Sequence, residues 1–585
     1  MALFTTSESP AITVKEVDLT SGVPNVQSTT GAYVGNFSWG PADTPVLVSD
    51  ERGLVSTFGA PRSSDSSAVN DGAAIDFMSA AYYLQYSNSL QVVRASNSTM
   101  KSAHGQTASS PGAVLVKNQD DFENQKSTLD TSNYIWVSKY PGALGNSLEV
   151  QFLQDSANFA NWTYAKNFPG KMGTSTFAAA RGASHDEFHL AVIDKGGDIS
   201  GTANTLLETF PYLSKASNHK NADGSTNFAP EVINRKSRYI NMAGFGASAF
   251  PANAGNAAEN AVDFRDASYL TVDSAVFAAG VNSGALGVTD IDGAYDTLFN
   301  DTDATEVDFL IAPSMKSRAD QKTLVNSMIA LAEGTRKDCV VVASPSRDDV
   351  IDKTPSTANA DVITAMDDIT FSSYAVLDNN FIKVYDKYND KYIHIPASSS
   401  TAGIMAASDA NTAPWFSPAG PRRGRYLGIT GLSYSPDKAQ RDALYKAGVN
   451  PIANIPGQGV LLYGDKTHMT RVSAFDRINV RRLFLVLERA ISRAAVNTLF
   501  EFNDEFTRAE FVNIVEPVLR NVKGRRGITD FKVVCDETNN TADVVDRNEF
   551  IASVFIKPAR SINYITLNFV GVRSGVDFEE VVGTV

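Results

Sequence analysis

The chain contains 585 residues, of which 43% are apolar and 20% charged, and its formal net charge is −14. A chain of this length exceeds one ordinary hydrophobic core, so about three domains are expected. No run approaches the roughly 18 consecutive apolar residues of a membrane helix. The only two cysteines, Cys339 and Cys535, exclude a disulfide scaffold or a cysteine-rich metal site, so we expect folding in a reducing cytoplasm.

The first strand-forming segment lies close to the N-terminus. In SPAITVKEVDL (9–19), Ile12 and Val14 share one face, whereas Val17 and Leu19 take the other. This switch of face predicts a bulge or twist in the strand. Chain ends usually fray, so a strand at this position needs a sheet edge to stabilise it.

The next region shows helix and strand patterns and then loses them. Residues 73–88 have helical spacing, and LQVVRAS (90–96) has the composition of a buried strand. In residues 97–285, Ser, Ala, Asn and Gly dominate and apolar runs are short. We interpret this segment as an inserted, mainly-β domain that faces outward.

Clear alternation resumes after residue 286. EVDFLIAPS (306–314), the helical segment 318–338 and CVVVASPSR (339–347) form a strand, a helix and a strand, which predicts a parallel sheet. Residues 381–398 read as a hairpin that turns at Asn389-Asp390. The segment SPAGPRRGR (417–425) is rich in Pro, Gly and Arg and indicates a domain boundary.

The C-terminal part combines helices with strands. A helix over residues 435–452 is expected to begin with Ser435 as its cap and Pro436 at its first position. Residues 475–502 carry the longest helical pattern, and residues 529–537 and 549–558 read as strands.

A last strand, Ser561–Arg573, lies at the end of the chain. Its residues Ile565, Leu567 and Phe569 alternate with polar neighbours, which is typical of a half-buried strand. Each terminal strand could complete a sheet of another subunit; about six net hydrogen bonds at about 1 kcal/mol each would make such a link worth several kcal/mol.

We therefore expect a multidomain protein of α/β and α+β class. Its C-terminal α+β core domain is completed by strands exchanged with neighbours, and its middle domain is α/β. The expected parts are an N-terminal exchange arm (1–22), a middle domain (23–96 and 286–424), the inserted outer domain (97–285) and the C-terminal core domain (425–585).

Charge is unevenly distributed along the chain. Residues 421–585 hold 23 Lys and Arg against 19 Asp and Glu, whereas the other residues hold 28 against 46. In the long helix, Arg482, Arg489 and Arg493 fall within a narrow arc outside the apolar stripe. This arc is either an ordinary solvated face or a basic ridge that faces an acidic cylinder or filament.

Motifs for catalysis are incomplete. HDEFH (185–189) has its acidic residue in the wrong position for a zinc helix and continues as a strand. PGKMGTS (169–175) lacks the first Gly and the Ser/Thr of a phosphate loop, and TDIDGAYD (289–296) leads to Phe299 where a calcium loop needs Glu. We predict no catalytic residue, metal ligand or cofactor, and hence a non-enzymatic protein.

Several long motifs resemble the tail sheath proteins of contractile-tailed bacteriophages, in particular the T-even-like type. The strongest are GDKT (464–467), FDRINVRRLF (475–484), VVCDETNNT (533–541) and PARSINYITLNF (558–569); softer ones include SPAITVKE (9–16), FSWGPA (37–42), TFGAP (57–61), RKDCVVVASPSR (336–347), YDKYND (385–390) and WFSPAGPRRG (415–424). Residues 97–285 depart from this pattern except at KYPGALGN (139–146).

The resemblance implies a structural subunit that forms a helical or stacked-ring homopolymer around a tail tube protein. On a baseplate trigger the sheath would contract and drive the tube through the host envelope. The implied partners are other copies, the tube, and the baseplate and tail terminator proteins, without direct nucleic-acid contact or membrane insertion. Such a protein is made in the host cytoplasm and resides in the virion tail. The arginine ridge would face the tube.

Two alternatives remain at this level. One is the sheath of a phage-derived contractile injection system, such as an R-type pyocin or a secretion machine. The other is an α/β enzyme whose site has no recognisable motif.

Overall fold

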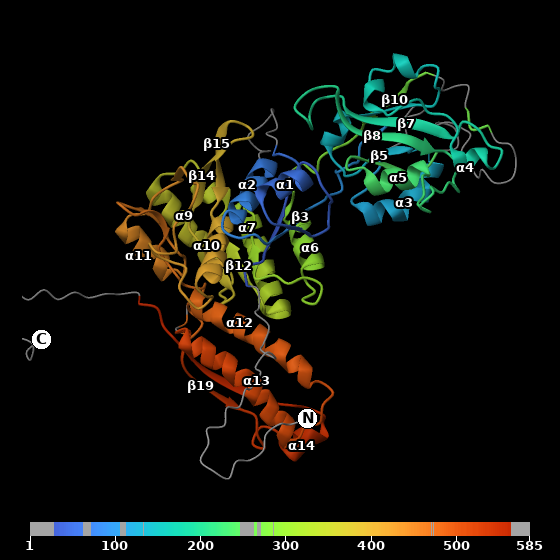
Figure 1. The fold of residues 1–585 in the computed structure, drawn as a ribbon. Helices are drawn as coiled ribbons and strands as arrows, with labels where there is room; N and C mark the ends of the chain where they lie inside the picture. Colours follow the sequence, from blue (N-terminus) through green and yellow to red (C-terminus); the bar gives the residue numbers. More distant parts are fainter. Residues whose placement is uncertain are drawn as a thin grey trace, which may run out of the picture. The chain divides into compact units, whose positions relative to one another are not determined.

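The computed structural model describes residues 28–61, 72–105, 113–132, 134–245, 263–265, 271–284, 286–469, 471 and 473–562. The chain divides into two compact units (Figure 1). One is Pro24–Ala490 and the other contains Ile491–Val585.

A six-stranded sheet forms the centre of the first unit, in the order β13-β12-β11-β1-β3-β2. Neighbouring strands are parallel except β2, which is antiparallel to β3. Strands far apart in sequence meet here, since Gly31 of β1 is in register with both Leu90 and Phe309. The strands are β1 (Gly31–Gly35), β2 (Val46–Val48), β3 (Leu90–Arg94), β11 (Phe309–Ile311), β12 (Val340–Ala343) and β13 (Ala375–Leu377).

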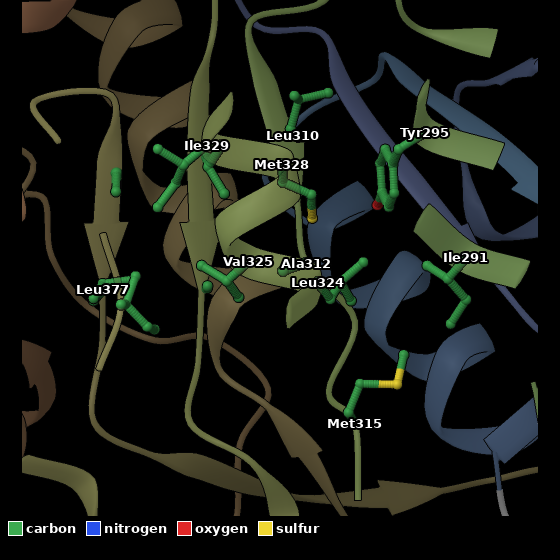
Figure 2. Close-up of a cluster of buried hydrophobic side chains, with 14 of the residues drawn as sticks. Ile291, Tyr295, Leu310, Ala312, Met315, Leu324, Val325, Met328, Ile329 and Leu377 are labelled. Carbon is green, nitrogen blue, oxygen red and sulfur yellow. The ribbon is translucent and has the colours of Figure 1, made fainter. Parts of the chain in front are cut away.

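Helices cover both faces of this sheet. Side chains of β12 alternate: Val341 packs with one helical layer, whereas Val340 and Val342 pack with the other. Burial on both faces explains the unbroken apolar run of this strand. Figure 2 shows the first layer, where Met328 lies beside Leu310 and Leu324 lies beside Ala312. That layer contains α6 (Val288–Leu298), α7 (Arg318–Ala330) and α9 (Pro355–Asp367); the opposite layer contains α1 (Glu51–Phe58), α2 (Gly72–Leu84) and α10 (Ser398–Asn411).

The predicted strand–helix–strand unit and the predicted hairpin are both confirmed. β11 and β12 are parallel and flank α7, which continues as a π-helical turn over Leu331–Arg336. The hairpin strands β14 (Phe381–Asp386) and β15 (Lys391–Pro396) are antiparallel. Asp390 in their turn has φ 49°, a conformation that Asp tolerates better than most residues.

The predicted boundary at residue 425 is wrong. β16 (Gly431–Leu432) pairs with β14, so this part of the chain completes a sheet of the first unit, which extends to Ala490. The predicted helix of residues 435–452 also begins later, because Asp437, not Ser435, accepts the backbone N–H of Gln440. The remaining elements of this region are α8 (Arg347–Val350), α11 (Lys438–Lys446), β17 (Ile452–Ile455) and β18 (Gly459–Leu462).

The segment expected to be an insertion contributes a sheet of its own. Its seven strands, in the order β8-β7-β6-β10-β4-β5-β9, all pair antiparallel around an aromatic and aliphatic core. The elements are β4 (His104–Gly105), α3 (Gln119–Thr131), β5 (Trp136–Ser138), β6 (Leu148–Leu153), α4 (Thr176–Ala179), β7 (Glu187–Asp194), β8 (Thr205–Ser214), α5 (Ala229–Lys236), β9 (Ile240–Met242) and β10 (Asp273–Ala278).

The second unit is small in its described part. A long helix, α13 (Glu505–Gly524), packs on β19 (Ile528–Val534), which pairs antiparallel with β20 (Ser553–Pro558). A short helix, α14 (Ala542–Asp546), lies in the connection between the two strands. The sequence predicts both strands but misses α13, which contains Pro517.

We expect Gly403→Ala to destabilise the fold. Gly403 lies in α10, which packs against α2, and an added Cβ would stand 2.6 Å from Cδ2 of Tyr86. That ring is fixed at its other end, because its hydroxyl accepts the Leu427 N–H at 2.6 Å. Overpacking of this kind costs about 1–3 kcal/mol, which should lower the thermal unfolding midpoint. Gly293→Ala in α6 is the matched control: nothing lies within 4 Å of its added Cβ, and Ala should leave the midpoint unchanged or raise it.

A buried carboxyl at the carboxyl edge of the central sheet makes stability depend on pH. Asp378 follows β13 and accepts hydrogen bonds from Ser344 Oγ at 2.8 Å and Thr401 Oγ1 at 3.0 Å. Burial raises the pKa of Asp378 to about 7, although these hydroxyls and the Asn380 N–H favour the ionised form. The folded chain thus binds this proton more tightly than the unfolded chain, in which the pKa is about 3.9.

The contribution of Asp378 to stability should therefore be largest below about pH 4 and be lost as the pH rises through about 7. Thermal midpoints of the wild type and Asp378→Asn are to be compared between pH 5 and pH 8. We expect the variant to gain relative to the wild type as the pH rises, because its amide does not ionise. A constant difference between the two proteins over this range would contradict the assignment.

Candidate assembly surfaces

The two terminal segments predicted to enter neighbouring subunits lie outside the described residues. The residues predicted to contact other subunits are Ile12, Val14, Val17 and Leu19 in the N-terminal arm and Ile565, Leu567 and Phe569 in the C-terminal strand. Their pairing with other copies stays a prediction.

The long C-terminal helix shows where the predicted basic ridge lies. This helix, α12, spans Ile478–Ala495, so it is shorter at both ends than the predicted 475–502. Arg482 is only 2% exposed and Arg489 only 11%. The prediction that these two side chains form an exposed ridge is therefore wrong. Arg493 is half-buried, and its proposed contact with a tube stays a prediction.

Arg482 and Arg489 instead belong to a buried ion-pair cluster with Asp308 and Asp409. Arg482 forms an ion pair with Asp409 and donates to the Ser28 carbonyl at 2.7 Å. Arg489 donates to Asp308 at 2.8 Å. The other oxygen of Asp308 accepts the Thr30 N–H at 3.0 Å.

The electrostatics of this cluster are set by burial. Burial raises the pKa of Asp409 to about 6, against the opposing effect of Arg482, and also raises the pKa of Asp308. The guanidinium of Arg482 lies 4.2 Å from the centre of the Phe309 ring, so one face contacts an aromatic side chain. Two buried guanidinium groups thus pair with two buried carboxyls, although Nε and Nη1 of Arg482 have no hydrogen-bond partner among the described residues.

The cluster connects four segments that are distant in sequence. They are the first described residues of the chain (Ser28 and Thr30), the residue before β11 (Asp308), the last part of α10 (Asp409) and α12. Helical periodicity could not reveal this arrangement, because α12 is buried on more than its apolar face. Leu485 lies outside the apolar stripe that the spacing predicts for this helix, yet it is also only 2% exposed. The first half of α12 is enclosed on nearly all sides.

The small sheet of the second unit has open edges. Among the described residues, β19 pairs only with β20, and β20 only with β19. α13 packs against β19, whereas Phe555 of β20 is 60% exposed. A two-stranded sheet is marginal by itself and gains stability from further strands. It is therefore a surface on which an additional strand could pair.

A second exposed surface follows α12. Leu499, Phe500, Phe502 and Phe506 form what we term the aromatic patch, and all four are largely solvent-accessible. Helical periodicity does not reveal this patch, because it predicts that the helix continues through Phe502, whereas α12 ends at Ala495. Apolar patches of this kind on a folded protein commonly mark interaction sites.

The histidine pair of residues 185–189 serves the fold of the insertion. His189 lies in β7, its Nε2 is 2.8 Å from the Gly170 carbonyl, and its Nδ1 accepts the Tyr212 N–H at 3.0 Å. Both ring nitrogens are thus occupied, and the predicted strand is confirmed. No group of three or more His, Cys, Asp or Glu placed to hold a metal ion occurs in the described part of the chain.

None of the helices formed by the described residues has both the length and the apolar character needed to cross a membrane.

Comparison with known proteins identifies the family. Residues 284–468 match the family model described as phage tail sheath protein central domain, and residues 470–570 match the one for the phage tail sheath C-terminal domain. The chain is 32% identical to the tail sheath protein of Vibrio phage KVP40 and to that of Enterobacteria phage T4; each match covers 98% of this chain and 99% of the relative. The chain belongs to the phage tail sheath protein family.

Solved structures agree at the level of the fold. The sheath tail protein of Listeria innocua matches with a TM-score of 0.51 at 11% identity, covering 92% of this chain and 97% of that one. The sheath tail protein of Desulfitobacterium hafniense matches with a TM-score of 0.50 at 13% identity, covering 94% and 100%.

We expect Arg482→Met to destabilise the chain by about 3–5 kcal/mol, because it leaves a buried carboxylate without its partner. The double variant Arg482→Met/Asp409→Leu should recover much of this loss, since it removes both charges together. Arg520→Met removes an exposed pair with Glu516 and should cost less than about 1 kcal/mol. Denaturant midpoints measure all three; equal effects of Arg482→Met and Arg520→Met would contradict the cluster's role.

Proposed function

We propose that this chain is a structural, non-enzymatic subunit that polymerises into a contractile phage tail sheath around a tail tube. The observation that carries the proposal is the open β19–β20 sheet, in a chain whose two ends are predicted strands. Membership of the tail sheath family supports the same assignment.

Strand exchange would complete this sheet. In the proposed polymer, the N-terminal arm (9–19) and the last strand (561–573) of neighbouring copies pair with β19 and β20 of a third copy. Each added strand would make about six net hydrogen bonds worth about 1 kcal/mol each. Links of this kind would hold subunits together while their bodies move.

The ion-pair cluster is well placed to anchor these links to the body of the subunit. Ser28 and Thr30 directly follow the N-terminal segment, and α12 leads into the second unit. Both segments are tied by Arg482, Arg489 and Asp308 to the central sheet. Force on either link would therefore be transmitted to the central sheet and to the hydrophobic layers on its two faces.

Contraction would follow from rearrangement of such a polymer. On a trigger from the baseplate, the sheath would shorten and widen, driving the tube through the host envelope so that the genome can pass. The energy would be stored in the assembly. The proposed partners are other copies, the tube, the baseplate and the tail terminator protein, and the proposed location is the virion tail. Identity of 31–32% with phage sheath proteins over nearly the whole chain favours a phage tail over an injection machine.

Deletion of residues 1–19 should abolish polymerisation and leave the body folded. Electron microscopy of the purified wild type should show long hollow tubes, whereas the truncated chain should remain as discrete particles with an unchanged thermal midpoint. The physical reason is the loss of one exchanged strand per subunit.

A finer variant keeps the chain length. Ile12→Asn/Val14→Asn should impair tube formation because it removes one apolar face of the predicted strand, whereas Thr5→Asn/Ser7→Asn, outside the strand, should not. If the truncated chain formed normal tubes, the proposed role of the N-terminal arm in polymerisation would be contradicted.

A further inference from the structure

The second unit carries opposite charge at its two ends. Residues 516–532 and 557–562, which we term the basic end, hold seven Lys and Arg against two Asp and Glu. Residues 501–510 and 536–549, the acidic end, hold nine Asp and Glu against two Arg. The net charges are thus +5 and −7. α13 runs from the acidic end toward the basic end, and its 20 residues span about 30 Å.

Hydrogen bonds join the two segments of each end. At the acidic end, the Asn503 side chain donates to the Glu549 carbonyl at 2.8 Å, which joins the two segments. At the basic end, the Ala559 N–H donates to the Gly527 carbonyl at 3.0 Å. The separation of charge is therefore a property of the folded unit.

The acidic end also carries the aromatic patch. Phe500, Phe502 and Phe506 are interleaved with Glu501, Asp504 and Glu505, and all six side chains are exposed. An apolar centre with a charged rim is the usual anatomy of a protein interface. The acidic rim selects a basic partner, and guanidinium groups pack well on aromatic rings.

We propose that the acidic end of the second unit binds the basic end of the second unit of another copy of this chain. A second copy matches both ends at once, whereas any other partner would match one. Such a contact is heterologous, so it repeats from subunit to subunit and generates a ring or a helix. The proposal rests on the polymerisation described above and adds to strand exchange a contact that sets how neighbouring units are ordered.

Seven exposed side chains allow a direct test, because none forms an ion pair within the described ranges. Variant A reverses the basic end with Arg526→Glu, Lys557→Glu and Arg560→Glu. Variant B reverses the acidic end with Glu501→Lys, Glu510→Lys, Glu537→Lys and Asp546→Lys. The pair Lys523–Asp530, 3.0 Å apart, stays unchanged. The control variant carries Lys166→Glu, Lys171→Glu and Lys220→Glu in the first unit.

Variant A retains an intact acidic end, and variant B retains an intact basic end. The critical concentration for tube formation should rise at least tenfold for A alone and for B alone, and should be unchanged for the control. In sedimentation at low salt, an equimolar mixture of A and B should form a heterodimer at least tenfold more tightly than either variant dimerises alone. Raising the salt to 1 M should abolish this preference, because charges are then screened within about 3 Å.

Thermal midpoints confirm that the variants fold. Folded variants that form tubes at wild-type concentrations would overturn the proposal, as would the absence of a preferred A–B heterodimer. Variants that polymerise normally by themselves but fail to assemble around a tail tube would also overturn the proposal. The tail tube would then be the partner of these two ends. If the wild type forms no tubes but A and B still pair, the proposed function fails and this contact stands.

Discussion

The buried cluster of Arg482, Arg489, Asp308 and Asp409 is the constraint on which the organisation of this chain depends. Two guanidinium groups and two carboxyls are removed from water together, so any movement that separates them leaves an uncompensated buried charge. The cluster fixes the first described residues of the chain, the start of β11, the end of α10 and the start of α12 relative to one another. Hydrophobic side chains in the same place could slide or repack. Separating these buried ion pairs would instead cost a large free energy.

The second unit has the opposite character. Within the part of the chain that the structure describes, its sheet has two strands with open edges, its aromatic patch is exposed, and its charges are separated between two ends. A unit with a large hydrophobic core is thus continuous in sequence with a unit whose two-stranded sheet would gain stability from further strands. This combination suits the proposed function, in which the body of the subunit would preserve its structure while contacts between copies rearrange.

Much of the first unit can be predicted from the sequence. The strand–helix–strand unit around α7, the hairpin at Asn389-Asp390 and the strand β7 depend on short-range periodicity and turn chemistry, which are local properties. Predictions failed at two helices of the C-terminal part of the chain. The helix of residues 475–502 ends at Ala495, and α13 was missed although Asp504 caps it by accepting the Thr507 N–H at 2.8 Å.

The sequence by itself determined the class of the fold and the membership of a sheath family, because short-range periodicity and long contiguous motifs carry this information. The strand character of both chain ends stays a prediction. Only the tertiary structure decided which charged side chains are exposed to solvent. Helical spacing places Arg482 and Arg489 on a common arc, but that arc is buried by Asp308 and Asp409, which lie more than 70 residues away in the chain. Burial is the sum of contacts from all elements of the fold, so no window of sequence contains it.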